Sequence, residues 1–186
     1  MNETLKVIAK RYSCRDYKKE MPSEEVLQAI GQAAIQSPSA RNRQPWQVII
    51  VKDNELIKDL QSEGMNQLSK LSDKTMYNNI MERGGKLFYG APCMVIIAID
   101  PNHDKYSWID CGILCQNVAL AATSMGLGNV ICGLTGLAFT DQQKSEKFSE
   151  RLGFPKGYIF GCSVLLGHVN ASREPHIPDQ NKITII

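Results

Sequence analysis

The chain has 186 residues, of which 43% are hydrophobic and 22% are charged, and its formal net charge is +2. This length suits one domain, residues 1–186, with a hydrophobic core of its own. The net charge is too small to attract nucleic acid or an anionic membrane, so we expect neither as a partner.

The six cysteines indicate the compartment. Most of them lie within apolar segments, and no two form a CxxC pair. The N-terminal residues lack the apolar run of a signal peptide, and no later run approaches the length of a membrane span. We therefore expect a cytoplasmic protein whose thiols are reduced.

The first half of the chain predicts helices before and after one strand. Apolar residues at helical spacing predict a short helix over 4–12 and a longer one over 24–36, with Ser23 as its N-cap. The run WQVIIV, residues 46–51, is apolar on both faces, as in a buried strand. A short helix from 54 to about 61 follows. Residues 62–90 are polar, with Gly84-Gly85 as a break, and show no clear pattern.

The second half predicts further strands around one long helix. The run over 107–125 is apolar or small on almost every side, which is typical of a helix buried all round, at the centre of the chain or at a subunit interface. Thr140 and Gln143 are spaced as a capping box for a helix over 141–151. Strands are predicted at 94–100, 129–134, 158–167 and, in the run ITII, 183–186. The expected fold is α+β, with one central mixed or antiparallel sheet wrapped by helices.

Several common motifs are absent from the sequence. Gly126 and Gly128 do not open a dinucleotide-binding loop, because they follow a helix and Ile131 replaces the third glycine. His103, His168 and His176 are scattered. Cys111 and Cys115 can share a helix face, but a metal site needs further ligands, so core packing is the simpler interpretation and no metal is expected. An enzyme without its own acid–base set often takes its chemistry from a cofactor.

Two clusters carry polar chemistry instead. The segment KRYSCRDY, residues 10–17, brings Arg11 and Arg15 together with hydroxyl groups. Guanidinium groups match phosphate oxygens, although a solvated basic surface would look the same. The loop SPSARNRQPWQ, residues 37–47, carries the amides Asn42 and Gln44, which suit the edge of a heterocycle. A loop that hydrogen-bonds its own backbone is the alternative.

Taken together, RYSCRDY and PSARNRQPW resemble the two N-terminal motifs of the FMN-dependent nitroreductase family, R-[RHY]-S-x-R-x-[YF] and P-S-x-x-N-x-Q-P-W. The family's order continues with FYGAP before an apolar strand, a D-x-G start at Asp110 and Gly112, and the segment from Gly126 to Gly133. The resemblance covers nearly the whole chain. It implies a nitroreductase-like fold and an intertwined homodimer that binds FMN at the subunit interface.

The resemblance also implies roles for particular residues. By this resemblance, the residues that contact the phosphate and the pyrimidine edge are Arg11, Tyr12, Ser13 and Arg15. The residues that contact the partner subunit's FMN are Pro38, Ser39, Ala40 and Asn42. The backbone amides expected to face flavin N5 are those of Cys132, Gly133 and Leu134. Asn66 is the candidate for the family's pyrimidine contact in the segment 62–90. Arg173, with His176 as the alternative, is the candidate for a basic residue near the phosphate.

The activity that follows is NAD(P)H-dependent FMN oxidoreduction. Hydride from reduced nicotinamide would reach flavin N5, and a nitroaromatic, quinone or similar small acceptor would then take two electrons in ping-pong order. No catalytic side chain is expected, because the flavin carries the chemistry. Two alternatives remain open: a specialised reaction on the same FMN fold, such as reductive dehalogenation, flavin breakdown or azoline oxidation, and a binding protein without enzymatic activity.

Overall fold

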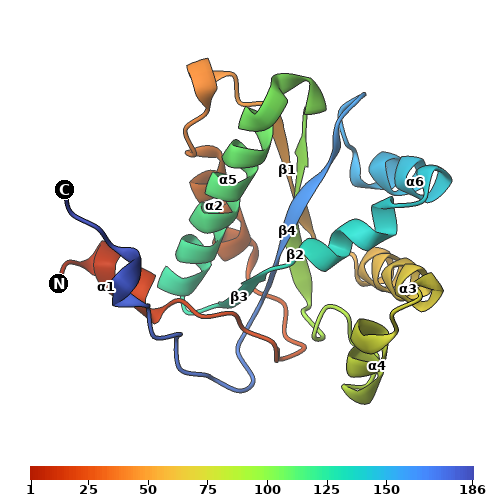
Figure 1. Cartoon of the computed structure of the whole chain (residues 1–186), viewed down its shortest axis with the longest axis horizontal. Coiled ribbons are helices and arrows are strands. Elements are labelled where there is room, and N and C mark those ends of the chain that lie inside the picture. Colours follow the sequence, from red (N-terminus) through yellow and green to blue (C-terminus); the bar gives the residue numbers. More distant parts are fainter.

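In the computed structural model of the chain, one sheet lies between two groups of helices (Figure 1). The structure describes the backbone of residues 1–186 and all side chains outside residues 103–105. The helices α2 (Glu24–Ile35) and α5 (Asp104–Ser124) cover one face of the sheet. The other face is covered by α3 (Asn54–Lys70), α6 (Gln142–Leu152) and the 3-10 helix η3 (Gly133–Phe139).

Along the described backbone, the strands form one antiparallel sheet of four in the order β1-β2-β4-β3. They are β1 (Trp46–Val51), β2 (Cys93–Ile99), β3 (Gly128–Ile131) and β4 (Ile159–Gly167). Every residue of β2 is buried, as its unbroken apolar run predicts. Of the two expected arrangements, mixed and antiparallel, the antiparallel one is observed, because every pair of neighbouring strands is antiparallel. A parallel contact occurs outside the strands, as an isolated bridge between Ser13 and Asn129.

The predicted helix starts are partly confirmed. Ser23 caps α2, since its hydroxyl accepts a hydrogen bond from the Val26 amide at 3.4 Å. The capping box at Thr140 and Gln143 was wrong, because α6 begins one residue later. There the side chain of Asp141 accepts from the Lys144 amide at 3.0 Å. A carboxylate at this position also interacts favourably with the helix dipole.

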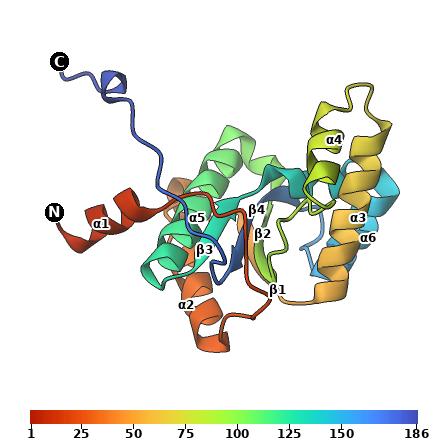
Figure 2. The ribbon, with the colours of Figure 1, turned by 90° about the horizontal axis from the view of Figure 1, so that it is seen from below.

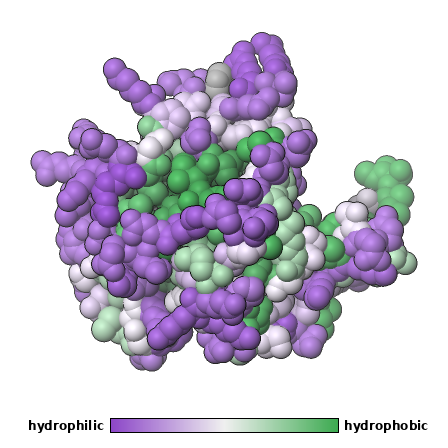
Figure 3. Space-filling view, turned by 180° about the vertical axis from the view of Figure 1, so that it is seen from behind, coloured by the Kyte–Doolittle hydropathy of each residue, from purple (hydrophilic) through white to green (hydrophobic). Residues whose placement is uncertain are grey.

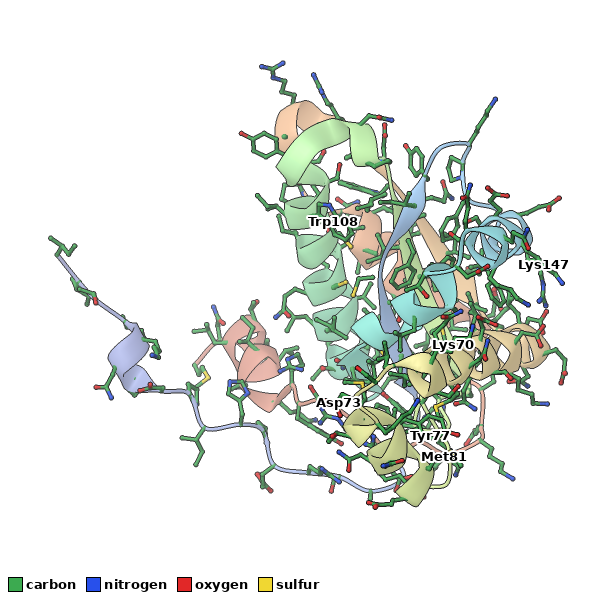
Figure 4. All side chains as sticks on the ribbon, turned by 45° about the vertical axis from the view of Figure 1, so that its right-hand side comes forward. Lys70, Asp73, Tyr77, Met81, Trp108 and Lys147 are labelled. Carbon is green, nitrogen blue, oxygen red and sulfur yellow. The ribbon has the colours of Figure 1, made fainter. Side chains whose placement is uncertain are left out.

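The segment 62–90, which shows no clear pattern in the sequence, is mostly helical. It contains the second half of α3 and the short helix α4 (Thr75–Glu82) (Figure 4). The predicted end of α3 near residue 61 was wrong because packing extends the helix beyond its apolar pattern. Gly64 packs so close to Leu87 that a Cβ atom would lie 2.6 Å from its Cδ2 atom.

The long helix α5 is buried on one side only. Leu114, Val118 and Ala122 face the sheet and are fully buried. Trp108 and Ile109 are each 54% exposed, so the prediction of a helix buried on every side is wrong for the single chain. Apolar residues occupy more of the surface of α5 than the sheet and α2 of the same chain cover.

The two ends of the chain project from the body. Both α1 (Glu3–Lys10) and the C-terminal tail with the 3-10 helix η4 (Gln180–Lys182) extend away from the sheet (Figure 2). No residue of α1 is buried, and Ile185 in the tail is 94% exposed. The predicted strand at 183–186 is absent from the described backbone, where this segment joins none of the four strands. None of the helices with described residues has the length and apolar character needed to cross a membrane.

Candidate functional site

The segment RYSCRDY runs along the β3 edge of the sheet. The Cys14 amide donates to the Asn129 oxygen at 2.8 Å, and Tyr17 forms an isolated bridge with Val169. Cys14 and Tyr17 point into the core, and the Tyr17 hydroxyl donates to the Cys14 oxygen at 3.0 Å. The alternating side chains Ser13 and Arg15 therefore lie on the outer side, partly or fully exposed.

Gly128 makes this close approach possible. A Cβ atom on Gly128 would lie 2.7 Å from the Sγ atom of Cys14 and 2.9 Å from Cγ2 of Val169. Both distances are shorter than a van der Waals contact, so a larger residue would push the two segments away from β3. The glycine of the GLG sequence thus serves packing of the site rather than a nucleotide loop.

The C-terminal segment joins the same region. The backbone of Arg173 lies close to the hydroxyl of Tyr12. Burial is the main cause of the raised pKa of Tyr12, so this hydroxyl stays protonated and neutral at physiological pH. Arg173 is thereby held beside the first motif. His176, the alternative in the sequence, is exposed further along the tail.

Two arginines lie near the ring of Tyr89. The guanidinium carbon of Arg15 is 5.9 Å from the ring centroid of Tyr89, and that of Arg83 is 5.3 Å from the same ring. Tyr89 has a φ of 55°, which is uncommon for a residue with a side chain. Such backbone strain persists where the surroundings hold it, and it is frequent at functional sites. Arg83 was missed in the sequence because it lies in 62–90, where no helical or motif pattern indicated it. Tyr89 belongs to the FYGAP segment but was not predicted as a site residue.

The turn between β3 and η3 contains the three amides predicted to face flavin N5. The Cys132 amide donates to the Ser163 oxygen at 2.8 Å, and the Ser163 hydroxyl donates to the Cys132 oxygen at 2.9 Å. Ser163 is fully buried and also shares a hydrogen bond of 2.8 Å with Thr135. Gly133 follows with open space in front of it, since a Cβ atom there would meet no atom within 4 Å.

The second motif forms a strained, exposed loop. Arg41, Asn42 and Gln44 have φ angles of 56°, 52° and 49°. The backbone amide of Gln44 donates to the Ser39 hydroxyl at 2.9 Å. The side-chain amide of Gln44 donates to Asn42 Oδ1 at 3.0 Å. The predicted contact residues Pro38, Ala40 and Asn42 are exposed, and Ser39 is partly exposed. The loop is therefore held by its own hydrogen bonds while its outer side chains face away from the chain.

Within one chain, the two motifs lie at opposite ends of α5 (Figure 1). The second motif is tied to the start of this helix, where the Asp100 amide donates to the Pro45 oxygen at 3.0 Å. The first motif is tied to its end through Asn129, whose side chain donates to Thr123 Oγ1 at 2.9 Å. A helix of 21 residues spans roughly 30 Å, so one chain does not bring the two motifs together.

Asn66 lies elsewhere again. Its side chain donates to Glu63 at 3.2 Å and lines a polar groove of about 410 Å³ between α3 and α6. The other residues lining this groove are Asp59, Ser62, Glu63, Lys144, Lys147, Phe148 and Arg151. Among the described residues of this groove, none besides Asn66 belongs to the predicted FMN contacts.

The described side chains contain no group of three or more His, Cys, Asp or Glu arranged to hold a metal ion. Of the three scattered histidines, His103 lies outside the described side chains. The residues that gather around β3 are instead arginines, hydroxyl groups and backbone amides. This set suits a phosphate and the polar edge of a ring more than a cation.

Comparison with known proteins agrees with this arrangement. A model of the Nitroreductase family matches residues 8–168. The crystal structure of a nitroreductase with bound FMN from Desulfitobacterium hafniense DCB-2 superposes with a TM-score of 0.97 at 61% identity, covering 100% of this chain and 99% of that one. A nitroreductase with bound FMN from Bacteroides fragilis NCTC 9343 gives a TM-score of 0.88 at 26% identity and covers 100% of both chains.

A curated relative points the same way. The FMN reductase [NAD(P)H] of Bacillus subtilis is 26% identical over 205 residues, which cover 97% of this chain and 72% of that protein. The family match spans far more than half of the chain, and the resemblance of the two N-terminal motifs is thus confirmed. This chain belongs to the nitroreductase family.

Proposed function

We propose that residues 1–186 form a single FMN-binding domain of an oxidoreductase that passes two electrons from NAD(P)H to small acceptors such as nitroaromatics or quinones. The observation that carries the proposal is the convergence of RYSCR, Arg173 and the β3–η3 turn on one edge of the sheet. The relatives support it, since the Desulfitobacterium hafniense protein holds FMN and the Bacillus subtilis protein is an NAD(P)H-dependent FMN reductase.

The residues at this edge fit FMN in two respects. The space in front of Gly133 lies beside the first amides of η3, which have no acceptor within their own helix. Arg11 and Arg173 lie near Tyr12, and Arg15 and Arg83 both lie near the ring of Tyr89, so cations are available for the phosphate and for carbonyl oxygens of the flavin ring. Arg83 is an additional candidate for a ring contact, and Asn66 stays a prediction.

The chain's own part in the reaction is binding, orientation and charge stabilisation. When bound, FMN supplies two-electron transfer, from the reduced nicotinamide and onward to the acceptor. The Cys132 amide already donates to the Ser163 oxygen, so the amides of Gly133 and Leu134 are the ones that would donate to the flavin edge near N5, where negative charge develops on reduction. Ser163 fixes this turn through two hydrogen bonds, so the amides are placed before reduction begins.

We further propose that the working form is a homodimer with FMN between the subunits. One chain separates the two motifs by the length of α5, so the exposed loop with Pro38, Ser39, Ala40 and Asn42 would complete the partner's site. Trp108 and Ile109 on the open side of α5 give the subunits an apolar surface to bury.

The back of the molecule supports the same assembly. An apolar groove of about 530 Å³ lies between α2 and the edge strand β1, lined in part by Ile35, Val48 and Ile50 (Figure 3). An edge strand presents unpaired backbone groups that another segment can bond. The run ITII, which joins no strand of the described backbone, has the apolar composition to cover such an edge in a second copy.

The flavin itself gives the first test. The purified protein is expected to be yellow, with the two visible absorption bands of bound flavin. A colourless protein that takes up no added FMN would reject the enzyme proposal and favour a binding role.

Kinetics give the second test. Initial rates with NADPH and a nitroaromatic at several concentrations of both are expected to give parallel double-reciprocal lines, as in ping-pong order. Intersecting lines would contradict that order. If the reduced protein reacts with no nitroaromatic or quinone but does react with a halogenated or azoline compound, the specialised reaction replaces the general one.

A further inference from the structure

Three of the six cysteines lie together between α5 and β4. Cys111 and Cys115 are one turn apart on α5 and are 3% and 2% exposed, while Cys162 on β4 is partly exposed. Cys162 packs against the apolar cluster that contains both Cys111 and Cys115, and its thiol interacts with that of Cys115. This thiol cluster, defined as Cys111, Cys115 and Cys162, has no role in the proposed flavin chemistry.

A bulge in the sheet brings the cluster together. The pairing of β2 with β4 shifts between Ile97 and Ala98, so Gly161 is left out of register beside Cys162. A Cβ atom on Gly161 would lie 2.9 Å from the Sγ atom of Cys111. The missing side chain therefore lets the sulfur atoms of α5 approach the strand, and Cys162 remains on the same face as them.

The thiols of the cluster differ in their acidity. A hydrogen bond from Cys115 lowers the pKa of Cys162 below that of an ordinary thiol. Hydrogen bonds to Cys111 and Cys162, followed by burial, raise the pKa of Cys115. Burial alone raises the pKa of Cys93 to about 12, which is the behaviour of a cysteine that only fills the core. Cys162, which is partly exposed, is therefore both the more accessible and the more acidic thiol of the cluster, and the buried Cys115 is its neighbour.

This pairing has the two parts of an oxidisable site. The thiolate is the nucleophile that reacts with peroxides, and a second thiol within reach traps the product as a disulfide. Metal binding does not account for the cluster, since the described side chains include no group of three or more Cys, His, Asp or Glu arranged to hold a metal ion.

We propose that Cys162 is a peroxide-reactive residue and that Cys115 closes on it to form a reversible disulfide between β4 and α5. The Cys162 thiolate attacks one oxygen of a hydroperoxide, the O–O bond breaks, and hydroxide or alkoxide leaves with a proton from water. Cys162 is then a sulfenic acid, oxidised by two electrons, and the peroxide is reduced by two. The sulfur of Cys115 next bonds to that of Cys162, and its proton leaves with the sulfenic hydroxyl as water.

Cys162 is adjacent in the chain to a residue that holds the β3–η3 turn in place. The next residue, Ser163, anchors the β3–η3 turn through Cys132 and Thr135. The disulfide would therefore form one residue from that anchor. The proposal concerns only this thiol chemistry, so it stands or falls independently of the flavin function.

The experiment treats the reduced holoprotein with a small excess of hydrogen peroxide. The expected product is lighter by about 2 Da, has lost two free thiols, and regains both with dithiothreitol. Peptide mapping without reduction should identify a Cys115–Cys162 link. A link between other cysteines, or unchanged Cys115 and Cys162 after treatment, would overturn the proposal even if no variant folds.

Variants separate the two roles. In Cys115→Ser, the sulfenic acid at Cys162 should persist and become labelled by dimedone, whereas Cys162→Ser should form neither the label nor the link. Cys93→Ser is the matched control, because this buried thiol lies outside the cluster on β2, and it should form the link as the unchanged protein does. Dimedone labelling of Cys162 that does not increase in Cys115→Ser would contradict the resolving role of Cys115.

Discussion

At the residue scale, the site depends on contacts between residues that are far apart in the sequence. Arg15 and Arg83 both lie near the ring of Tyr89, although Arg15 is some seventy positions away from the other two residues. Gly128 is adjacent to Cys14 and Val169 at distances that leave no room for a methyl group. Both features show that the first motif depends on the rest of the fold for its position.

Arg15→Ala is expected to weaken FMN binding. The substitution removes a charge-assisted contact of about 1.5–3 kcal/mol, which corresponds to roughly 10- to 150-fold in affinity. Titration of the apoprotein with FMN, followed by flavin fluorescence, measures the change. Arg151→Ala is the control, because its guanidinium bonds Asp59 at 2.7 Å in the groove between α3 and α6. Equal affinities in the two variants would reject the role of Arg15.

Gly128→Ala is expected to destabilise the fold. The added methyl group would overlap Cys14 and Val169, and overpacking of this kind costs about 1–3 kcal/mol. For a chain of this size, a midpoint shift of about 2–4 °C per kcal/mol is expected in thermal unfolding. Gly112→Ala, where a Cβ atom would meet nothing within 4 Å, should unfold at the same temperature or slightly higher. Equal midpoints would mean that the first motif is not tightly packed on β3.

At the element scale, the sequence predicted the strands better than the helix ends. Three predicted strands agree with β1, β2 and β4 to within one residue at each end, because their apolar runs are continuous and short. The strand expected over 129–134 stops at Ile131, where Ser163 bonds Cys132 and the chain turns into η3. That turn depends on a residue thirty-one positions away, so local pattern could not indicate it.

Asp141→Ala tests the revised start of α6. Loss of the cap at the Lys144 amide is expected to lower the free energy of unfolding by about 0.5–2 kcal/mol. Gln143→Ala should change it by less than about 0.5 kcal/mol, because Gln143 is exposed and does not cap the helix. Urea unfolding followed by circular dichroism compares the variants. The opposite order of effects would restore the capping box at Thr140 and Gln143.

At the scale of the whole molecule, a single chain leaves both apolar surface and polar chemistry exposed. The open side of α5 carries Trp108 and Ile109, and the loop after α2 presents its strained residues away from the body. The groove beside β1 and the projecting tail add to this surface. Each feature is costly for a monomer and is explained by the proposed homodimer.

Dilution is expected to release FMN. If each site is completed by the partner's loop, flavin should leave at the same protein concentration at which the dimer dissociates. Sedimentation velocity and flavin fluorescence over a dilution series measure the two events. A monomer that keeps its flavin would contradict a shared site.

Trp108→Glu should move both events to higher protein concentration. A charge on the open side of α5 would be buried without a partner in the dimer, which is strongly unfavourable. Lys147→Glu is the control, because Lys147 lies on α6, on the other side of the sheet from Trp108 (Figure 4). If both variants dissociate at the concentration of the unchanged protein, the open side of α5 is not the interface.

The sequence by itself determined the family, the buried strands and the residue types of both motifs, because these depend on local periodicity and on neighbours in the chain. Only the tertiary structure decided that the sheet is antiparallel, that one chain holds the two motifs at opposite ends of α5, and that Arg83 and Tyr89 join Arg15. It also decided that Cys162 joins the cysteine pair of α5. These contacts link residues that are distant in sequence, and their pairing follows from packing rather than from any local pattern.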